Sequence, residues 1–307
     1  MVGKNQLHGV WRQGKEFVLV KDLMIVVLTG ATSGLGRIVA RRLAVDGVHL
    51  VLPVRDERRG DDLRQELHRL ATRSAVDVFV ADLSLMADVS RLGTDIAAAV
   101  DRVDVLINNA GLHAFAPRGT VEGLPEMMAV NYLAPWLLTE KVMPALSRAS
   151  GGRVVNVASE ASRRHGTLGL PSDLTDTRPF TGRQSSALYG KTKLLDIMFT
   201  MELARRTAAA GMTANCLDPG FNVTGLGREL SFAAPLERVL KALRIGDPAR
   251  GAHLIHRVAT SSEFDGVTGA YIGVRHAEPL VPAWPAGDEA LQERLWDDTA
   301  ALLEPWR

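Results

Sequence analysis

Short unbroken hydrophobic runs alternate along the chain with longer stretches in which apolar residues recur every three or four positions. The runs, which predict buried strands, lie at residues 24–28, 49–54, 77–80, 103–107, 153–158, 213–217 and 270–272. The periodic stretches, which predict amphipathic helices, lie at residues 37–45, 57–72, 125–147, 185–210, 247–260 and 288–303. This alternation predicts an α/β fold, a doubly wound parallel sheet of about seven strands with helices on both faces.

Residues 23–307 are predicted to form a single domain, preceded by an N-terminal extension of residues 1–22. Apolar residues of the extension could pack on the domain or on a second subunit. Residues 160–188 are long for a connection in a compact domain, so we predict a substrate loop there. Residues 221–246 are rich in leucine, which predicts a mobile apolar lid, with an ordinary packed helix as the alternative.

The first predicted strand runs directly into a glycine-rich turn and then into a helix. Glycines let the backbone approach a pyrophosphate closely, and the helix N-terminus supplies N–H groups and a positive dipole. Strand, turn and helix together form the context that a dinucleotide-binding fingerprint requires. The sequence therefore predicts a Rossmann-type fold with a cofactor site that includes Gly30, Thr32, Ser33, Gly34, Leu35 and Gly36.

The end of the second strand bears on the choice between the two nicotinamide cofactors. An acidic residue there would accept a hydrogen bond from the adenosine 2′-hydroxyl of NAD(H), whereas an arginine would pair with the 2′-phosphate of NADP(H). Arg55 follows the strand directly, and Asp56 comes next. We favour Arg55 and NADP(H), with Asp56 and NAD(H) as the alternative; both residues could also simply begin an exposed helix.

Further candidate residues follow other strands, at the sheet edge where ligands of such folds bind. They are Asp82 and Leu83, Asn109 with Ala110 and Gly111, Ser159, and Pro219 with Gly220. Asp82 alone could be only a helix cap, but the shared edge strengthens the prediction of a ligand site. Pro135 lies four residues after Asn131 and has no N–H, so the main-chain carbonyl of Asn131 loses its helical partner and could hold a water. The alternative is that Pro135 only kinks the helix over the sheet.

Tyr189 and Lys193 are four residues apart in a predicted helix, so they project from the same face. A phenol ordinarily keeps its proton up to a pH of about 10, but a neighbouring ammonium favours the phenolate and lowers that pKa. The pair is therefore a candidate proton donor and acceptor tuned toward working pH. The spacing alone occurs by chance on many surface helices, so this candidate depends on the other motifs.

Composition narrows the class of protein. Of the 307 residues, 46% are hydrophobic and 23% are charged, as in globular proteins. The formal net charge of +1 gives no reason to expect a nucleic-acid partner. Cys216 is the only cysteine, which excludes an internal disulfide and a multi-cysteine metal site. Because no signal peptide and no membrane-spanning run is evident, we expect a soluble cytoplasmic protein without a membrane or metal requirement.

In their order and spacing, these motifs resemble the short-chain dehydrogenase/reductase family. The resemblance covers about residues 24–275 and rests on Thr29-Gly30-xxx-Gly34-x-Gly36, Asp82, Asn108-Asn109-Ala110-Gly111, Asn131, Ser159, Tyr189-xxx-Lys193 and Pro219-Gly220. The chain looks most like the retinol-dehydrogenase-like group, on Leu52-Pro53-Val54-Arg55-Asp56, Val130-Asn131-Tyr132-Leu133 and Leu295-Trp296-Asp297. Two places depart from the family pattern: Asn222 replaces an aliphatic residue, and Ala134-Pro135 replaces a glycine followed by a polar or aromatic residue.

The resemblance implies hydride transfer between a nicotinamide and a carbon that bears oxygen. It implies that Tyr189 transfers the proton, that Ser159 holds the substrate oxygen, and that Lys193 lowers the pKa of Tyr189 and holds the nicotinamide ribose. Asn131, through its carbonyl and a water, would connect Lys193 to solvent. The remaining cofactor residues that it implies are Pro219, Gly220, Asn222 and Thr224.

Members of the family commonly form dimers or tetramers through two long helices, here residues 125–147 and 185–210, so a homodimer or homotetramer is expected. We predict an oxidoreductase, either a ketone or aldehyde reductase or an alcohol dehydrogenase, that acts on a bulky, mainly apolar small molecule. Two alternatives stay open: epimerisation or dehydration by transient oxidation with the same cofactor, and a non-catalytic dinucleotide sensor.

Overall fold

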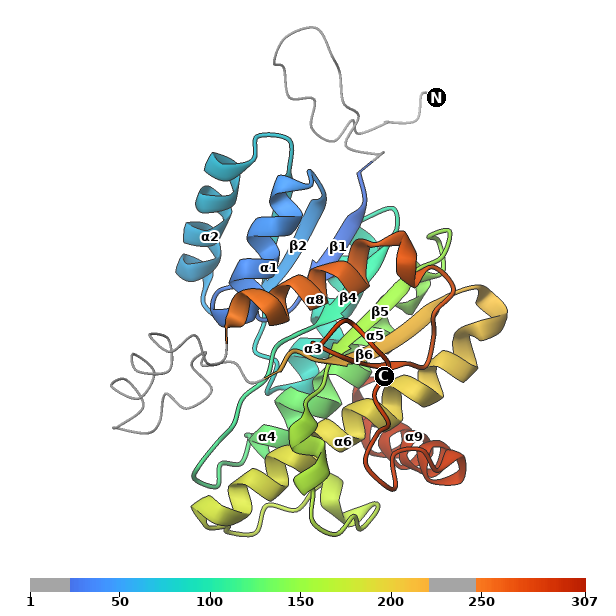
Figure 1. The fold of residues 1–307 in the computed structure, drawn as a ribbon. Coiled ribbons are helices and arrows are strands. Elements are labelled where there is room, and N and C mark those ends of the chain that lie inside the picture. Colours follow the sequence, from blue (N-terminus) through green and yellow to red (C-terminus); the bar gives the residue numbers. More distant parts are fainter. Residues whose placement is uncertain (1–22, 221–246) are drawn as a thin grey trace, which may run out of the picture.

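The computed structural model describes residues 23–220 and 247–307, which fold around a seven-stranded sheet (Figure 1). The strands are β1 Ile25–Leu28, β2 His49–Val54, β3 Ala75–Val80, β4 Val105–Asn108, β5 Arg153–Val157, β6 Thr213–Asp218 and β7 Tyr271–Gly273. They lie in the order β3-β2-β1-β4-β5-β6-β7, and each neighbouring pair is parallel. The predicted doubly wound parallel sheet is confirmed.

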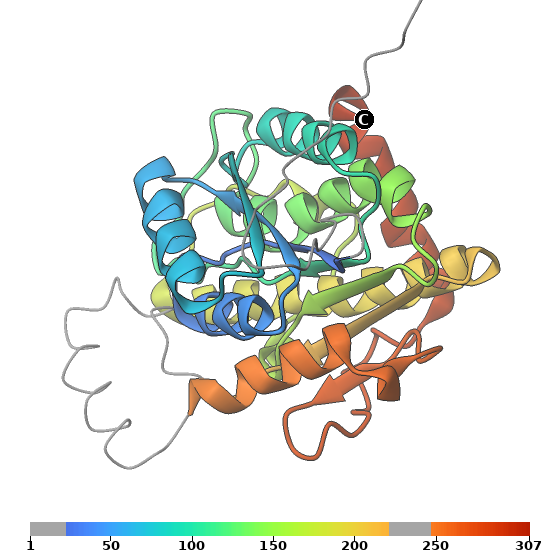
Figure 2. The same ribbon diagram turned by 90° about the horizontal axis from the view of Figure 1, so that it is seen from above.

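Helices cover both faces of the sheet (Figures 1 and 2). The helices are α1 Gly34–Val45, α2 Glu57–Leu70, α3 Met86–Ala99, α4 Glu126–Met128, α5 Ala134–Leu146, α6 Gly182–Thr207, α8 Pro248–Thr260 and α9 Glu289–Leu303. Buried side chains of α1, α2 and α8 form one core cluster, and those of α3, α5, α6 and α9 form the other. The two clusters lie on opposite faces of the sheet.

The residues of β1 explain why such strands appear as unbroken hydrophobic runs. Ile25 and Val27 belong to one core cluster, whereas Val26 and Leu28 belong to the other. Successive side chains of a strand point to opposite faces, and both faces of this sheet are covered by helices. Each position of the strand is therefore apolar, and its sequence shows no alternation of hydrophobic and polar residues.

The predicted helix over residues 125–147 is interrupted. A π-helical turn, Ala129–Leu133, separates α4 from α5, and the N–H of Ala134 donates to the carbonyl of Ala129, five residues back. Pro135 lies at the start of α5, where a missing N–H costs little. The π-helical turn contains Asn131, four residues before this proline, so the helix is interrupted by a wide turn rather than by a simple kink within one α-helix.

The predicted substrate loop of residues 160–188 contains more regular structure than expected. Two 3₁₀ turns, Glu160–Arg164 and Ser172–Leu174, lie within it. Helix α6 begins at Gly182, three residues before its predicted start, because Thr181 and Gln184 form a reciprocal capping box. The N-terminal extension 1–22 and the predicted lid 221–246 lie outside the described residues.

The described ranges, 23–220 and 247–307, contain no helix with both the length and the apolar character needed to cross a bilayer.

Candidate active site

The glycine-rich turn joins β1 to α1 in a space too narrow for side chains. Gly30 has a φ of +71°, a conformation that residues with a side chain rarely adopt. A Cβ at Gly36 would collide with the carbonyl oxygen of Gly30. Glycine at these two positions therefore lets the first turn of α1 pack directly onto the loop and brings backbone N–H groups to its surface.

The N-terminus of α1 is not capped by a side chain of its own residues. Ser33 occupies the cap position but makes no side-chain cap hydrogen bond, and the first turn holds no acidic residue. In contrast, α2, α6, α8 and α9 are capped by the side chains of Asp56, Thr181, Asp247 and Asp288. Unpaired N–H groups and the positive end of the helix dipole attract anions. This turn therefore fits the pyrophosphate of a dinucleotide.

Hydrogen bonds tie the end of β4 to the glycine-rich turn. The Thr29 hydroxyl oxygen accepts from the N–H groups of Asn109 and Ala110, each at 3.0 Å, and the Asn109 amide donates to the Thr29 carbonyl at 2.9 Å. Gly111 follows, and a Cβ there would lie 3.4 Å from Asn131 Oδ1 and 3.9 Å from Lys193 Nζ. The predicted cofactor residues after β4 therefore lie between the glycine-rich turn and the predicted catalytic residues.

At the end of β2, the two candidates for cofactor selectivity have different surroundings. Asp56 Oδ1 accepts a hydrogen bond from the N–H of Arg59 at 3.2 Å and so caps α2. Arg55 is exposed directly after the strand. The carboxylate of Asp56 thus caps α2, and the contact of Arg55 with a cofactor phosphate stays a prediction.

Asp82, after β3, organises its own turn. Its carboxylate accepts from the N–H of Ser84 at 2.9 Å, and its N–H donates to Asp88 at 3.0 Å. Asp82 and Leu83 are both partly buried at the same edge of the sheet as the glycine-rich turn. The local turn explains Asp82 without a ligand, and a cofactor contact there stays a prediction.

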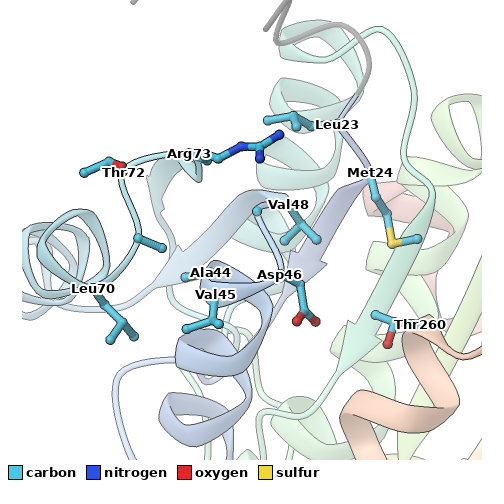
Figure 3. Close-up of a pocket in the computed structure, with 12 residues that line it drawn as sticks. Leu23, Met24, Ala44, Val45, Asp46, Val48, Leu70, Thr72, Arg73 and Thr260 are labelled. Atoms are coloured by element: carbon cyan, nitrogen blue, oxygen red, sulfur yellow. The ribbon is translucent and has the colours of Figure 1, made fainter. Parts of the chain in front are cut away.

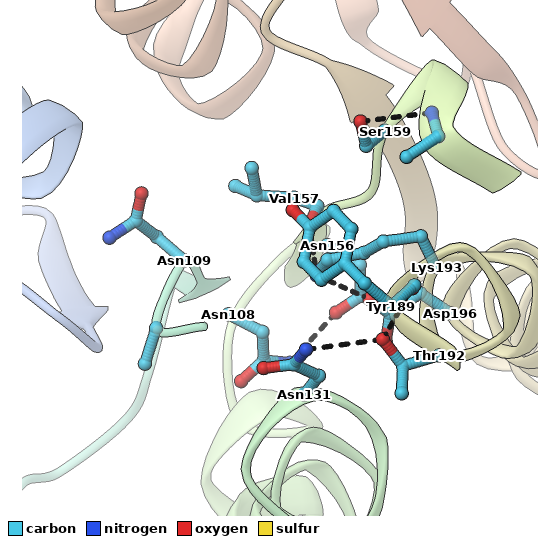
Figure 4. Close-up of polar contacts among 12 residues, drawn as sticks. Asn108, Asn109, Asn131, Asn156, Val157, Ser159, Tyr189, Thr192, Lys193 and Asp196 are labelled. Atoms are coloured by element: carbon cyan, nitrogen blue, oxygen red, sulfur yellow. Dashed lines mark hydrogen bonds and ion pairs between the residues drawn. The ribbon is translucent and has the colours of Figure 1, made fainter. Parts of the chain in front are cut away.

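Tyr189 and Lys193 lie one turn apart on α6, facing the end of β5 (Figure 4). Lys193 Nζ donates to the Val157 carbonyl and to Asp196 Oδ2, both at 2.8 Å. Ser159 follows β5, and its hydroxyl oxygen accepts from the N–H of Ala161 at 3.1 Å. That bond caps a 3₁₀ turn and leaves the hydroxyl proton of Ser159 available for a substrate oxygen.

The side chain of Asn131 is used to hold the neighbouring backbone. Its Oδ1 accepts from the N–H of Leu112 and its Nδ2 donates to the Leu112 carbonyl, both at 2.8 Å. Nδ2 also donates to the Thr192 hydroxyl at 3.1 Å, next to Lys193 on α6 (Figure 4). Since Pro135 cannot donate to it, the main-chain carbonyl of Asn131 remains the group suited to a water.

The electrostatic surroundings of Tyr189 correct one prediction from the sequence. Burial raises the pKa of the phenol more than the Lys193 ammonium lowers it, and the carboxylates of Asp196 and Asp218 raise it further. The pKa of Tyr189 therefore lies above its ordinary value, and the prediction of a lowered pKa is wrong in direction. The lysine acts as predicted, but the prediction left out desolvation and the carboxylates.

Two neighbours of Tyr189 were missed in the sequence. Asp196 lies three residues after Lys193, a spacing that places both side chains on one face of a helix and could have revealed it. His113 stacks on the ring of Tyr189, with centroids 4.7 Å apart and planes inclined by 17°. No sequence signal marks His113. It lies in the loop after β4, and a loop has no regular hydrophobic pattern from which the orientation of a side chain could be predicted.

A cavity of about 620 Å³, shown in Figure 3, is lined by none of these residues. Its lining includes Met24 before β1, Val48 before β2 and Arg73 before β3. It therefore opens at the amino ends of the strands, whereas ligands of open α/β sheets bind at the carboxyl ends. The cavity has no part in the candidate active site.

Comparison with known proteins places the chain in a family. A family model described as short chain dehydrogenase matches residues 24–170. Retinol dehydrogenase 14 of Mus musculus is 33% identical over 291 residues, covering 91% of this chain and 85% of the mouse protein. The crystal structure of an uncharacterised protein from Mycobacterium paratuberculosis has a TM-score of 0.70 and 27% identity, covering 93% of this chain and 97% of that one.

A second solved structure, blue fluorescent protein from a metagenomic library in complex with NADPH, has a TM-score of 0.64 and 26% identity. It covers 82% of this chain, which in turn covers 96% of it. The chain belongs to the short-chain dehydrogenase/reductase family, as its motifs predicted, and is similar to members of its retinol-dehydrogenase-like group. It is an NAD(P)-dependent oxidoreductase acting on CH–OH or C=O groups.

Proposed function

We propose that the protein transfers hydride between NADP(H) and a bulky, mainly apolar alcohol or carbonyl compound, with Tyr189 as the general acid and base. The observation that carries this proposal is the convergence of Tyr189, Lys193, Asn131 and Ser159 beyond the glycine-rich turn. Two of these residues come from α6, one from the π-helical turn and one from the end of β5. Such an arrangement brings a proton donor and a hydroxyl to one substrate oxygen.

A bound nicotinamide would supply or accept the hydride. In the reducing direction, the Tyr189 hydroxyl gives its proton to the substrate oxygen, and the Ser159 hydroxyl donates a hydrogen bond that holds this oxygen. The Lys193 ammonium favours the phenolate that remains and is suited to the ribose hydroxyls. The Asn131 carbonyl, through a water, links Lys193 to solvent. Proton transfer of this kind contributes roughly a hundred- to ten-thousand-fold to the rate.

For the cofactor, Leu35 and the N-terminus of α1 would bind the pyrophosphate, together with Thr32, Ser33 and Gly34. Pro219 and Gly220, which follow β6, are suited to the nicotinamide end. The predicted contacts of Asn222 and Thr224 lie outside the described residues. Two observations support NADP(H). Arg55 is exposed at the end of β2, beside Asp56, whose carboxylate already accepts a hydrogen bond from the N–H of Arg59. The blue fluorescent protein, a structural relative, was solved in complex with NADPH.

Replacing Arg55 by alanine is expected to weaken NADPH binding by roughly tenfold or more while changing NADH binding little, because only NADPH carries the 2′-phosphate. Fluorescence titration of both cofactors measures the two dissociation constants. Arg58, an exposed residue of α2, provides the matched control: Arg58→Ala is expected to have the smaller effect. Equal losses of NADPH and NADH affinity in Arg55→Ala would contradict the assignment and favour Asp56.

An apolar substrate is supported by the rings beside Tyr189. His113 stacks on the phenol ring, and the ring of Phe115 lies 4.4 Å from that of His113. Both are only partly buried, so they offer a flat wall next to the reacting hydroxyl. The name of the mouse relative, retinol dehydrogenase 14, points to a substrate of the same apolar character.

A panel of aldehydes and ketones tests this proposal by the loss of NADPH absorbance. We expect steady NADPH consumption whose kcat/KM rises with the apolar surface of the substrate. A panel that includes retinoid and long-chain aldehydes beside small polar ones separates the two classes. Product formed without net NADPH consumption would instead favour epimerisation or dehydration, and NADPH binding without any turnover would favour a sensor.

We further propose that the protein forms a homodimer or homotetramer and acts on small molecules in the cytoplasm. The helices expected at the subunit contact are α5 and α6, which lie on one face of the sheet. The formal net charge of +1 supports a role without nucleic acid.

A further inference from the structure

The ring of Tyr189 packs against aromatic rings from the loop after β4. The centroids of the His113 and Tyr189 rings are 4.7 Å apart and the two planes are inclined by 17°, so the rings are stacked. The ring of Phe115 lies 4.4 Å from that of His113, with an inclination of 30°. Rings at such separations attract each other more strongly than the burial of their surface alone explains. His113 therefore joins the rings of Phe115 and Tyr189 into one group.

The main chain on both sides of His113 is anchored by buried polar side chains. Before it, the N–H and the carbonyl of Leu112 are bound by the Asn131 side chain, both at 2.8 Å. After it, the carbonyl of Ala114 accepts a hydrogen bond from the Ser185 hydroxyl at 2.5 Å. Asn131 and Ser185 are both fully buried, and a buried polar group that loses its partner is costly. The loop therefore holds the imidazole firmly in place.

The same helix holds this loop and carries the reacting phenol. Ser185 lies four residues before Tyr189 in α6, so the two side chains project from one face of that helix. The serine fixes the loop from which His113 extends, and the His113 ring covers the Tyr189 ring. Moving the loop away from α6 would therefore break a buried hydrogen bond as well as the ring stack.

The plane of the Tyr189 ring matters because it sets the direction in which the proton is given. The O–H bond of a phenol lies preferentially in the plane of its ring, since the oxygen is conjugated with the ring. The torsion angle that turns this plane, χ2, has broad minima in tyrosine, so rotamer preference alone does not define it closely. A hydroxyl that must meet a substrate oxygen is not available for a fixed protein hydrogen bond either. Packing against a flat neighbour fixes the plane and leaves the hydroxyl open.

We propose that His113 is a positioning residue: by stacking on Tyr189 it fixes the plane of the phenol ring and so directs the phenolic O–H toward the substrate oxygen. The inference rests on the proposed function, in which Tyr189 transfers the proton. It goes beyond that function by giving the loop after β4 a part in directing the proton. Since the role needs a flat ring and not an imidazole nitrogen, phenylalanine can replace His113, but alanine and leucine cannot.

His113→Ala is expected to lower kcat for carbonyl reduction by roughly tenfold, because the phenol ring gains freedom and fewer of its orientations are productive. The Kd of NADPH should not change. His113→Phe should retain most of the wild-type kcat, and His113→Leu, which fills similar space without a flat ring, should behave like the alanine variant. A histidine that only lined the substrate pocket would change KM and leave kcat in place. A wild-type kcat in both His113→Ala and His113→Leu therefore overturns the inference.

The same substitution in Tyr189→Phe separates an effect on the hydroxyl from an effect on the substrate. Without the hydroxyl there is no O–H to direct, so His113→Ala should not slow the residual single-turnover reduction any further. Equal fold losses from His113→Ala in the two backgrounds would mean that the histidine acts independently of the Tyr189 hydroxyl, and would overturn the inference.

Fluorine NMR of protein labelled with 3-fluorotyrosine tests the stacking without a substrate. The chain has three tyrosines, and the signals of Tyr189 are those that are missing in Tyr189→Phe. The flip rate of the Tyr189 ring, obtained from its line shapes, should rise in His113→Ala and His113→Leu and stay near the wild-type value in His113→Phe. An unchanged flip rate in the alanine and leucine variants contradicts the proposed stacking role.

His256→Ala is the control for removing a partly buried histidine. The His256 ring bonds to Asp46 and lies on α8, which packs on the opposite face of the sheet from α6. This variant should change neither kcat nor the flip rate of Tyr189, and thermal unfolding identifies the variants that remain folded. If the flip rates behave as expected but no substrate is reduced, the proposed function fails and the restraint of the Tyr189 ring by His113 stands.

Discussion

Replacing Tyr189 by phenylalanine is expected to lower kcat/KM for carbonyl reduction by roughly a hundred- to ten-thousand-fold and to leave the Kd of NADPH nearly unchanged. The change removes one hydroxyl, the proposed proton donor, and keeps the ring that stacks on His113. Steady-state NADPH oxidation and cofactor fluorescence measure the two effects separately. A loss of kcat without a loss of cofactor affinity is the pattern of a group that acts in the transition state.

Tyr271 offers the control for this experiment. Its hydroxyl donates to Glu160 Oε1 at 3.0 Å, and its ring is buried on β7. Tyr271→Phe removes the same atom from a buried tyrosine and should retain most of the activity. Substantial carbonyl reduction by Tyr189→Phe, or equal losses in the two variants, would mean that the proton comes from another group.

Replacing Lys193 by alanine is expected to have the second largest effect, on three properties at once. Turnover should slow because the phenolate loses its cation, and NADPH should bind more weakly because the ribose loses a donor. The folded state should lose about 3–5 kcal/mol, because Asp196 is left as a buried charge without a partner. Kinetics, cofactor titration and denaturant unfolding measure these three changes.

The double variant Lys193→Met with Asp196→Asn separates stability from function. It removes both buried charges, so the free energy of unfolding should return most of the way to the wild-type value. Activity and NADPH affinity should stay low, because both depend on the Lys193 ammonium, which the double variant still lacks. An unchanged Kd of NADPH in Lys193→Ala would contradict the proposed ribose contact.

Much of the fold could be predicted because each strand of this sheet is buried on both faces. The unbroken runs around Val27 and Leu106 leave few other interpretations, and the seven strands appear within one or two residues of their predicted places. Local chemistry at helix starts was harder to use. The capping box of Thr181 and Gln184 was present in the sequence, but the amphipathic period of α6 begins only after it, so the start of α6 was set too late.

The break in the helix around Asn131 was only partly predictable. Pro135 marks a lost hydrogen bond, but whether the chain bends or widens into a π-helical turn depends on packing. Here the Asn131 side chain forms hydrogen bonds with both the N–H and the carbonyl of Leu112, in the loop after β4. The wide turn brings the Asn131 side chain to that loop. Such a contact between residues 19 apart leaves no periodic trace in the sequence.

Within the site, residue types could be predicted but their surroundings could not. The spacing of Tyr189 and Lys193 predicts that a phenol and an ammonium lie side by side. If no other group acted on the phenol, the ammonium would lower its pKa. The structure adds burial and two carboxylates, and the direction is reversed. Desolvation depends on what the rest of the chain places around a group, which a motif does not contain.

Transfer of deuterium from NADPH that carries deuterium in place of both hydrogens on the reactive carbon of its nicotinamide tests the central claim most directly. The protein, labelled NADPH and an apolar aldehyde or ketone are incubated, and the alcohol is analysed by mass spectrometry. The account predicts one deuterium on the carbinol carbon of the wild-type product and almost no labelled product with Tyr189→Phe, although that variant still binds NADPH. An alcohol without deuterium, or equal labelling by Tyr189→Phe, would contradict it.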